Sequence, residues 1–144
     1  MIDYRVLGPG DLDLLMSAPQ LFDDPLREDS ARAFLAAAGQ LMVLALDGGT
    51  PVGFASGTVL LHPDKRPSLF VNEVGVEQSH QRRGIGRELT RRLIAHAEEA
   101  HGCTTAWLAT EPDNAPALAL YRSMAGDEET FRLFGWGFLW NDEN

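Results

Sequence analysis

The alternation of hydrophobic and polar residues along the chain predicts most of its secondary structure. Five apolar runs bounded by turn residues have the length and composition of β-strands, at residues 2–7, 41–47, 51–61, 68–76 and 103–110. Three shorter amphipathic or alanine-rich runs predict helices, at residues 12–18, 30–38 and 115–124. Asp47, Gly48 and Gly49 are typical of a hairpin turn, so the second and third strands should be antiparallel.

A longer helix is predicted to begin at residue 85, after the fourth strand. Ile85, Leu89, Leu93 and Ala97 recur at four-residue spacing and form one apolar face. A final aromatic-rich run, residues 129–140, predicts a terminal strand or hairpin. The order is strand, two helices, three strands, helix, strand, helix and strand. This order, without repeats or linkers, predicts a mixed α/β fold and a single domain over residues 1–144.

Length and charge narrow the classes of function. A chain of 144 residues with 44% hydrophobic content is long enough for one compact core. A formal net charge of −9 argues against nucleic acid or an anionic membrane as a partner, and suits a cationic substrate as well as plain solubility. The chain starts without a secretory signal pattern and lacks an apolar run of the ~18 residues that span a bilayer, so we expect a cytoplasmic location.

The metal-ligating residue types are sparse. Cys103 is the single cysteine, which excludes an internal disulfide and a cysteine-rich metal site. The four histidines lack the spacing of metal ligands: His62, His80, His96 and His101. We therefore predict no metal.

The most informative stretch is Gln-Arg-Arg-Gly-Ile-Gly at residues 81–86, between a strand and the long helix. Gly84 and Gly86 permit positive φ angles and close backbone approach, so successive N–H groups can converge on an anion at the positive end of the helix dipole. Arg82 and Arg83 would add charge and hydrogen-bond donors beside a polyphosphate. The alternative is an ordinary glycine-containing loop with solvated arginines.

Two common phosphate-binding motifs do not fit this stretch. A dinucleotide fingerprint requires glycine at position 89, which is Leu89. A P-loop requires Lys and then Ser or Thr after its last glycine, where this chain has Arg87 and Glu88.

The stretch at residues 81–86 does resemble the acetyl-CoA motif Gln/Arg-x-x-Gly-x-Gly/Ala of the GNAT superfamily of N-acetyltransferases. Further along, Asn-Ala-Pro-Ala-Leu-Ala-Leu-Tyr-Arg-Ser-Met-Ala-Gly is similar to the family segment Asn-Ala-x-x-Leu-Tyr-x-x-x-Gly. The spacing departs from the family pattern, because Asn114 and Tyr121 are seven residues apart and Ala125 is an extra residue before Gly126. The resemblance implies a mostly antiparallel central sheet flanked by helices, and acetyl-CoA as co-substrate.

The resemblance also implies which residues bind the donor. The backbone at residues 74–76 would pair with the pantetheine arm, and the loop at 81–86 would hold the pyrophosphate. Asn114 would either cap the following helix or bond to the pantetheine. The donor-binding set is Val74, Gly75, Val76, Gln81, Arg82, Arg83, Gly84, Ile85, Gly86 and Asn114.

Two side chains are candidates for proton transfer. Glu73 interrupts an apolar strand, and partial burial would raise its pKa and make it a base for a substrate ammonium. It is otherwise an ammonium anchor or an ordinary residue on an exposed strand face. Tyr121 is matched in pKa to a thiol and would protonate the leaving thiolate. Its alternative role is that of a core tyrosine.

The acceptor is less constrained by the sequence. Within the superfamily, the acids around the tyrosine helix look most like those of the aminoglycoside 3-N-acetyltransferases, so we favour an aminoglycoside as a small cationic acceptor. Five acids in loops or at element ends would bind it: Asp23, Asp24, Asp113, Glu128 and Glu129. A protein, peptide or polyamine N-acetyltransferase and a catalytically silent acyl-CoA-binding module remain alternatives.

One aromatic pattern stands apart from this chemistry. Phe134, Trp136, Phe138 and Trp140 alternate with other residues, which predicts one apolar strand face. This face is either core or the surface of a homodimer.

Overall fold

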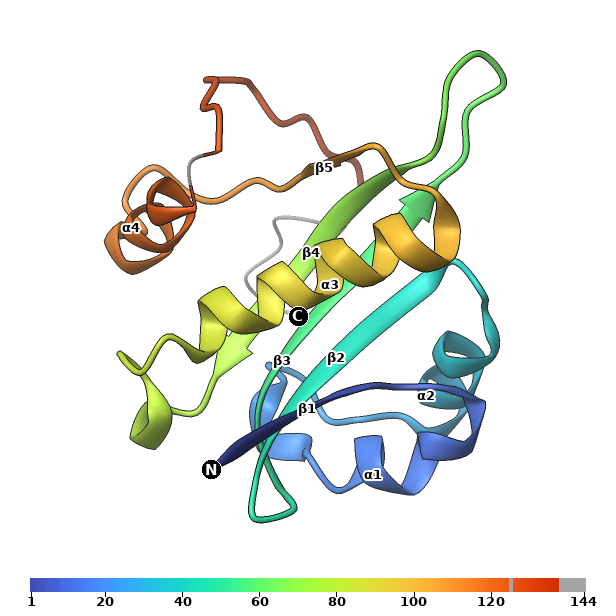
Figure 1. Ribbon diagram of the computed structural model, residues 1–144, viewed down its shortest axis with the longest axis vertical. Helices are drawn as coiled ribbons and strands as arrows, with labels where there is room; N and C mark the ends of the chain where they lie inside the picture. Colours follow the sequence, from blue (N-terminus) through green and yellow to red (C-terminus); the bar gives the residue numbers. More distant parts are fainter. Residues whose placement is uncertain (125, 138–144) are drawn as a thin grey trace.

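The computed structural model describes residues 1–124 and 126–137 and forms a sheet with helices on both faces (Figure 1). Its elements in chain order are β1 (Ile2–Val6), η1 (Pro9–Asp11), α1 (Leu12–Met16), η2 (Pro19–Leu21), α2 (Glu28–Ala36), β2 (Gln40–Asp47), β3 (Thr50–Leu60), β4 (Ser68–Val76), η3 (Gln78–His80), α3 (Ile85–His101), β5 (Thr105–Trp107) and α4 (Ala115–Ser123). The strand order is β1-β2-β3-β4-β5. Neighbouring strands are antiparallel except for β4 and β5, which are parallel. The predicted mixed α/β fold with a mostly antiparallel sheet is confirmed.

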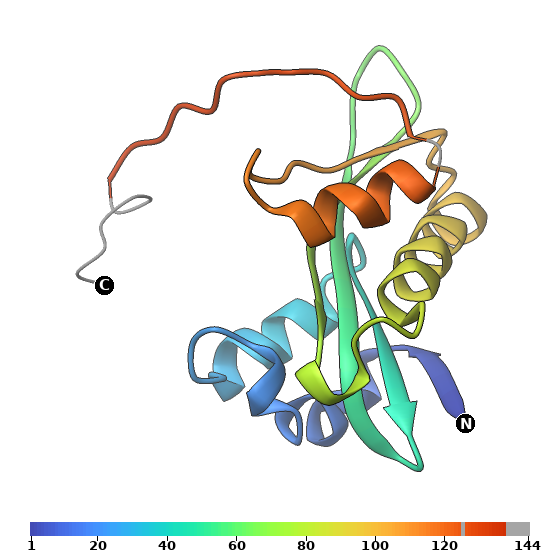
Figure 2. The same cartoon turned by 90° about the vertical axis from the view of Figure 1, so that its left-hand side faces the viewer.

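The two faces of the sheet carry separate apolar clusters. Helix α3 covers one face, where Leu89 and Leu93 are fully buried against residues of β2, β3 and β4. Helices α1 and α2 cover the other face, around Leu44 and Phe54. Figure 2 shows these two layers on opposite sides of the sheet. Alternation along β2 and β3 therefore serves both layers, since successive side chains point to opposite faces.

Glycine in β3 allows α3 to lie close to the sheet. A Cβ atom at Gly57 would lie 2.9 Å from Cδ1 of Leu69 and 3.3 Å from Cδ2 of Leu93. It would also lie 2.8 Å from the carbonyl oxygen of Phe70 on β4. No side chain fits at this position without moving the backbone of β4.

Strand β4 contains a bulge at Asn72. Ser56 of β3 pairs with Glu73, but the next residue, Gly57, pairs with Val71, so Asn72 is an extra residue in β4. A bulge of one residue reverses the faces of all later side chains relative to the earlier ones. Val71 packs in the α3 layer, and so does Val74 after the bulge, whereas Glu73 is turned toward the other face.

The predicted terminal strand is wrong for the part of it that the structure describes. Residues 129–137 have no strand pairing, and Figure 2 shows this segment arching away from the sheet. The physical reason is the short edge strand: β5 pairs only through Thr105 to Trp107, after which the chain leaves the sheet. The core interpretation is also wrong for Phe134 and Trp136, which are 74% and 85% exposed. Phe138 and Trp140 lie outside the described residues.

Two further features concern Cys103 and the helices. Cys103 is buried, and this burial raises the pKa of its thiol. Within residues 1–124 and 126–137, no helix combines the length and the apolar character needed to cross a bilayer.

Candidate functional site

The loop between β4 and α3 contains two residues in the left-handed backbone region. Arg82 and Gly84 both have left-handed backbone conformations, with φ of 65° and 79°. Alternating left-handed residues turn successive N–H groups toward a common centre, which is the geometry of an anion-binding nest. The N–H groups of residues 85–87 follow at the start of the 17-residue helix α3, where they have no partner within the helix. These backbone conformations are compatible with the predicted phosphate site, which stays a prediction.

The two glycines of this loop have different roles. Gly84 is the left-handed residue, and nothing lies within 4 Å of the position its Cβ would take. Gly86 is helical, and its Cβ would lie 3.4 Å from Cδ2 of Leu120 on α4. The prediction of a positive φ is therefore confirmed for Gly84 and wrong for Gly86, where the missing side chain lets α4 approach α3.

Two side-chain hydrogen bonds stabilise the loop and the start of α4. Gln81 donates from Nε2 to the carbonyl of Val76 at 3.1 Å, which ties the loop to the end of β4. Asn114 accepts a hydrogen bond from the N–H of Ala117 at 3.2 Å, so it caps α4. Arg83 is exposed at the same loop.

Strands β4 and β5 separate beside this loop. Their pairing runs from Ser68 with Thr105 to Phe70 with Trp107 and stops there. Beyond it, the edge of β4 at residues 71–76 has no strand partner on that side within the described part of the chain. An open strand edge of this kind can bond to an extended ligand through its backbone.

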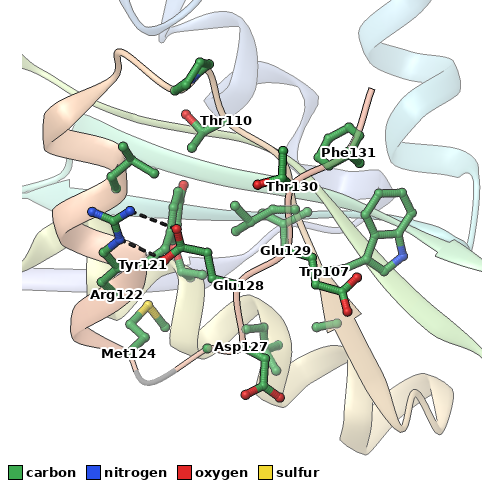
Figure 3. A pocket seen from close by; sticks show the side chains of 18 residues that line it. Trp107, Thr110, Tyr121, Arg122, Met124, Asp127, Glu128, Glu129, Thr130 and Phe131 are labelled. Carbon is green, nitrogen blue, oxygen red and sulfur yellow. Dashed lines mark hydrogen bonds and ion pairs between the residues drawn. The ribbon is translucent and has the colours of Figure 1, made fainter. Parts of the chain in front are cut away.

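A cavity of about 600 Å³ lies between α3, β5, α4 and residues 126–131 (Figure 3). Apolar side chains such as Ile94 and Leu118 line part of it, and acids of the C-terminal segment line another part. Tyr121 of α4 contributes to the wall, and burial raises the pKa of its hydroxyl. A raised pKa keeps this phenol protonated at neutral pH, as a proton donor requires.

The acids at this cavity are not equivalent. Arg122 donates from Nε and from its terminal nitrogen to the two carboxylate oxygens of Glu128, both at 2.8 Å. Figure 3 shows this pair joining α4 to the C-terminal segment. The guanidinium lowers the pKa of Glu128. Glu129 also lines the cavity. Glu128 is therefore already neutralised by a protein cation, unlike the acceptor-binding carboxylate that the sequence suggested.

A second group of acids lies around Glu73. The bulge in β4 turns this side chain toward the loop that connects η2 to α2. Partial burial raises the pKa of the Glu73 carboxyl, and the negative charges of Asp23 and Asp24 raise it further. These three predicted residues are thus neighbours in space although about 50 positions separate them in sequence.

The predicted acceptor residues therefore fall into separate groups. Asp23 and Asp24 accompany Glu73, while Glu128 and Glu129 line the cavity with Tyr121. Asp113 is exposed in the turn before α4.

Sequence reasoning missed the cavity residues Trp107, Thr110 and Phe131. Trp107 is the last residue of β5, Thr110 follows that strand and Phe131 follows α4, and none of the three belongs to a motif that the sequence offered. Within residues 1–124 and 126–137, no three histidine, cysteine or acidic side chains are grouped to hold a metal.

The sequence matches the family model of the acetyltransferase (GNAT) family over residues 12–126. The chain belongs to this family. N-alpha-acetyltransferase RimI of Mycobacterium tuberculosis is 38% identical over 107 residues, which cover 73% of this chain and 65% of that protein. The [ribosomal protein bS18]-alanine N-acetyltransferase of Escherichia coli K12 is 41% identical over 84 residues, 58% of this chain and 53% of that protein. The chain thus matches about half to two thirds of the length of these relatives.

Solved structures share the fold of this family member. An aminoglycoside acetyltransferase from an uncultured soil metagenomic sample superposes with a TM-score of 0.80 at 23% identity, covering 95% of this chain and 98% of that one. Aminoglycoside N-acetyltransferase AAC(6')-Iy in complex with CoA gives a TM-score of 0.74 at 22% identity, covering 95% and 94%. At such identities the likeness shows the fold alone.

Proposed function

We propose that this chain transfers an acetyl group from acetyl-CoA to a primary amine. The observation that carries the proposal is the left-handed pair Arg82 and Gly84 at the start of α3, beside the open edge of β4. The converging N–H groups suit a pyrophosphate, and the strand edge suits the amide-bearing pantetheine arm. When bound, acetyl-CoA supplies a thioester whose carbonyl carbon an amine can attack.

Two side chains of this protein carry out the proton transfers in this proposal. Glu73, as a base, takes a proton from the acceptor ammonium directly or through water, so that the neutral amine can form the new C–N bond. Tyr121 gives its proton to the sulfur as the C–S bond breaks, and the nitrogen, which is cationic once the C–N bond has formed, releases its second proton to solvent. Tyr121 is then reprotonated from solvent. The raised pKa of Glu73 suits its role, because the carboxylate accepts a proton more readily. The raised pKa of Tyr121 keeps the phenol protonated until a thiolate forms, but also makes it a weaker acid than a free tyrosine.

The first candidate acceptor is the α-amine of a protein or peptide. The relatives that share 38% and 41% identity with this chain are named as an N-alpha-acetyltransferase and a ribosomal-protein alanine N-acetyltransferase. An α-ammonium carries a positive charge that the acids at Glu73 attract.

The second candidate is an aminoglycoside, with acetylation at the 3-N position as its narrower form. The observation that favours it is the presence of two groups of acids, one at Asp23 and Asp24 and one at the cavity, which suit an acceptor with several ammonium groups. A polyamine would satisfy the same charges.

A thiol-release assay separates these candidates. Wild-type protein is incubated with acetyl-CoA and, in turn, with an alanine-initiated peptide, its N-terminally blocked control, gentamicin and spermidine. Turnover with the free peptide but not the blocked peptide supports the first candidate, and turnover with gentamicin alone supports the second. CoA binding without thiol release from any amine would leave a silent acyl-CoA-binding module and contradict the proposed transfer.

A further inference from the structure

A chain of three side chains joins the anion-binding loop to a distant hairpin. In a neutral His80 ring, Nε2 donates to a carboxylate oxygen of Asp47 at 2.8 Å, because a carboxylate only accepts. The other ring nitrogen, Nδ1, then accepts from the hydroxyl of Ser79 at 2.7 Å. Both polar atoms of the imidazole are therefore bonded. None of these three residues has a part in the acetyl transfer proposed above.

The contact between His80 and Asp47 links parts of the chain that are 33 residues apart. His80 ends η3 in the loop, and Asp47 ends β2 immediately before the hairpin to β3. The His80 side chain is only 17% exposed. The Asp47 side chain is 39% exposed, so the hydrogen bond is partly buried and restrains the loop more than a contact between two fully exposed side chains would.

Short backbone hydrogen bonds hold the first residues of the loop, followed by a longer one of 3.4 Å from the N–H of Gln81 to the carbonyl of Gln78. Glu77 donates its N–H to the carbonyl of Val52 at 2.8 Å, and His80 donates its N–H to the carbonyl of Glu77 at 2.9 Å. Two residues after His80, Arg82 has a left-handed φ of 65°, which costs free energy for a residue with a Cβ. Such conformations persist where the surrounding structure restrains them. Gln81, directly before the strained residue, is bonded through its side chain to the carbonyl of Val76, and the His80 ring adds a second restraint two residues before Arg82.

We propose that His80 is a positioning residue for the donor: by binding Asp47 and Ser79, it holds the loop at residues 77–84 in the conformation that directs its N–H groups at the donor's pyrophosphate. The inference rests on the proposed function. Asp47 has a pKa lowered chiefly by its bond from His80 and, to a smaller extent, by the charge of Arg83. The ionised Asp47 therefore also lies within the electrostatic reach of an arginine of the loop.

Two donors distinguish a positioning role from a general structural role. Acetyl-CoA contains the pyrophosphate, whereas S-acetyl-pantetheine carries the same thioester and lacks it. His80→Phe keeps a ring of similar size and removes both hydrogen bonds. We expect this change to raise the Kd of CoA, measured by calorimetry, and the KM of acetyl-CoA by about tenfold, as for the loss of two restraining hydrogen bonds. The kcat/KM for S-acetyl-pantetheine should stay within about twofold of wild type, because no phosphate contact is lost.

Variants of Asp47 and Ser79, the two partners of His80, should weaken CoA binding to different extents. Asp47→Asn keeps an acceptor oxygen and should retain most of the wild-type affinity for CoA. Ser79→Ala removes one hydrogen bond and should have a Kd for CoA between those of wild type and His80→Phe. His62→Phe is the matched control, since His62 makes a single hydrogen bond to Ser68, at 3.0 Å and away from the loop. It should leave the affinity for CoA unchanged.

Each outcome bears on one proposal or the other. An equal loss with both donors in His80→Phe, or an unchanged Kd for CoA, would overturn the role of His80 while leaving the acetyltransferase proposal intact. Wild-type protein that fails to bind CoA would overturn the proposed function and this inference with it. Should His80→Phe not fold, an unchanged Kd for CoA in both Ser79→Ala and Asp47→Ala would likewise overturn the role of His80.

Discussion

Gly84 and Gly86 allow a quantitative test of the donor site, because they lie two residues apart and are glycine for different reasons. At Gly84 a Cβ meets nothing within 4 Å, but φ is 79°. The cost of Gly84→Ala is therefore that of placing alanine in a left-handed conformation, about 1 to 2 kcal/mol. At Gly86 the backbone is helical, and alanine gains about 1 kcal/mol in helix propensity. This gain is offset by a contact of 3.4 Å with the flexible end of Leu120.

The free-energy cost of alanine at position 84 can reduce either the stability of the protein or its affinity for CoA. If the loop keeps its conformation in Gly84→Ala, the free energy of unfolding falls by about 1 to 2 kcal/mol and CoA affinity is unchanged. If the loop relaxes without ligand, stability is retained and CoA must restore the strained form, which weakens binding by about five- to thirtyfold. The loss in the free energy of unfolding and the loss in the free energy of CoA binding should therefore add up to about 1 to 2 kcal/mol in either case.

Urea denaturation and CoA titration of the same protein samples measure both parts. Gly84→Asn should recover part of the loss, since asparagine tolerates the left-handed region better than alanine. Gly86→Ala should lie within about 0.5 kcal/mol of wild type in stability. A Gly84→Ala protein that matches wild type in both measurements would show that the left-handed conformation is not required, and would refute the assignment of the donor site.

The remaining predictions concern the proposed chemistry. Glu73→Gln should lose most activity near neutral pH, where the acceptor amine is protonated, and a loss that is uniform across pH would indicate a binding role for Glu73. Folding raises the pKa of Glu73, so its carboxyl stabilises the native state only at low pH, and this contribution is lost as the pH rises through the native pKa. In urea denaturation at neutral pH, Glu73→Gln should therefore be no less stable than wild type. Tyr121→Phe should lower kcat about 10²-fold without weakening CoA binding, and intact turnover would make Tyr121 a packing residue. Glu129→Gln should raise the acceptor KM more than Glu128→Gln, because Arg122 already neutralises Glu128; the reverse order would contradict that explanation.

The elements that could be predicted from the sequence are those with a strong local signal. The apolar face of α3 follows from the spacing of Ile85, Leu89 and Leu93, and all three side chains are buried. The loop at residues 81–86 was identified through its glycines and arginines. Its place between a strand and a helix is confirmed, because both neighbours have clear apolar periodicity.

The parts that could not be predicted depend on contacts between distant residues. Alternation along β4 does not reveal which face Glu73 occupies, since the bulge at Asn72 changes the face and leaves no compositional signal. The neighbourhood of Asp23 and Glu73 likewise arises from the packing of the η2–α2 loop on the sheet. At the C-terminus, alternation of aromatic residues predicted a strand, but a strand also needs a partner edge, which is a property of the sheet rather than of the segment.

The bulge at Asn72 makes β4 sensitive to changes of length in a way that substitutions would not reveal. Replacing Asn72 by another exposed residue leaves the number of residues in β4 unchanged, so Glu73 stays where it is. Deleting Asn72 would remove only the extra residue, so Val71 would stay opposite Gly57 and Glu73 opposite Ser56, and Glu73 and Val74 would keep their faces while the strand lost its local kink. A deletion or insertion after the bulge, within residues 74–76, would instead exchange the faces of the residues that follow it. We therefore expect natural relatives and engineered variants of this chain to tolerate many side chains, and even a gap, at position 72, and to avoid changes of length between the bulge and the anion-binding loop.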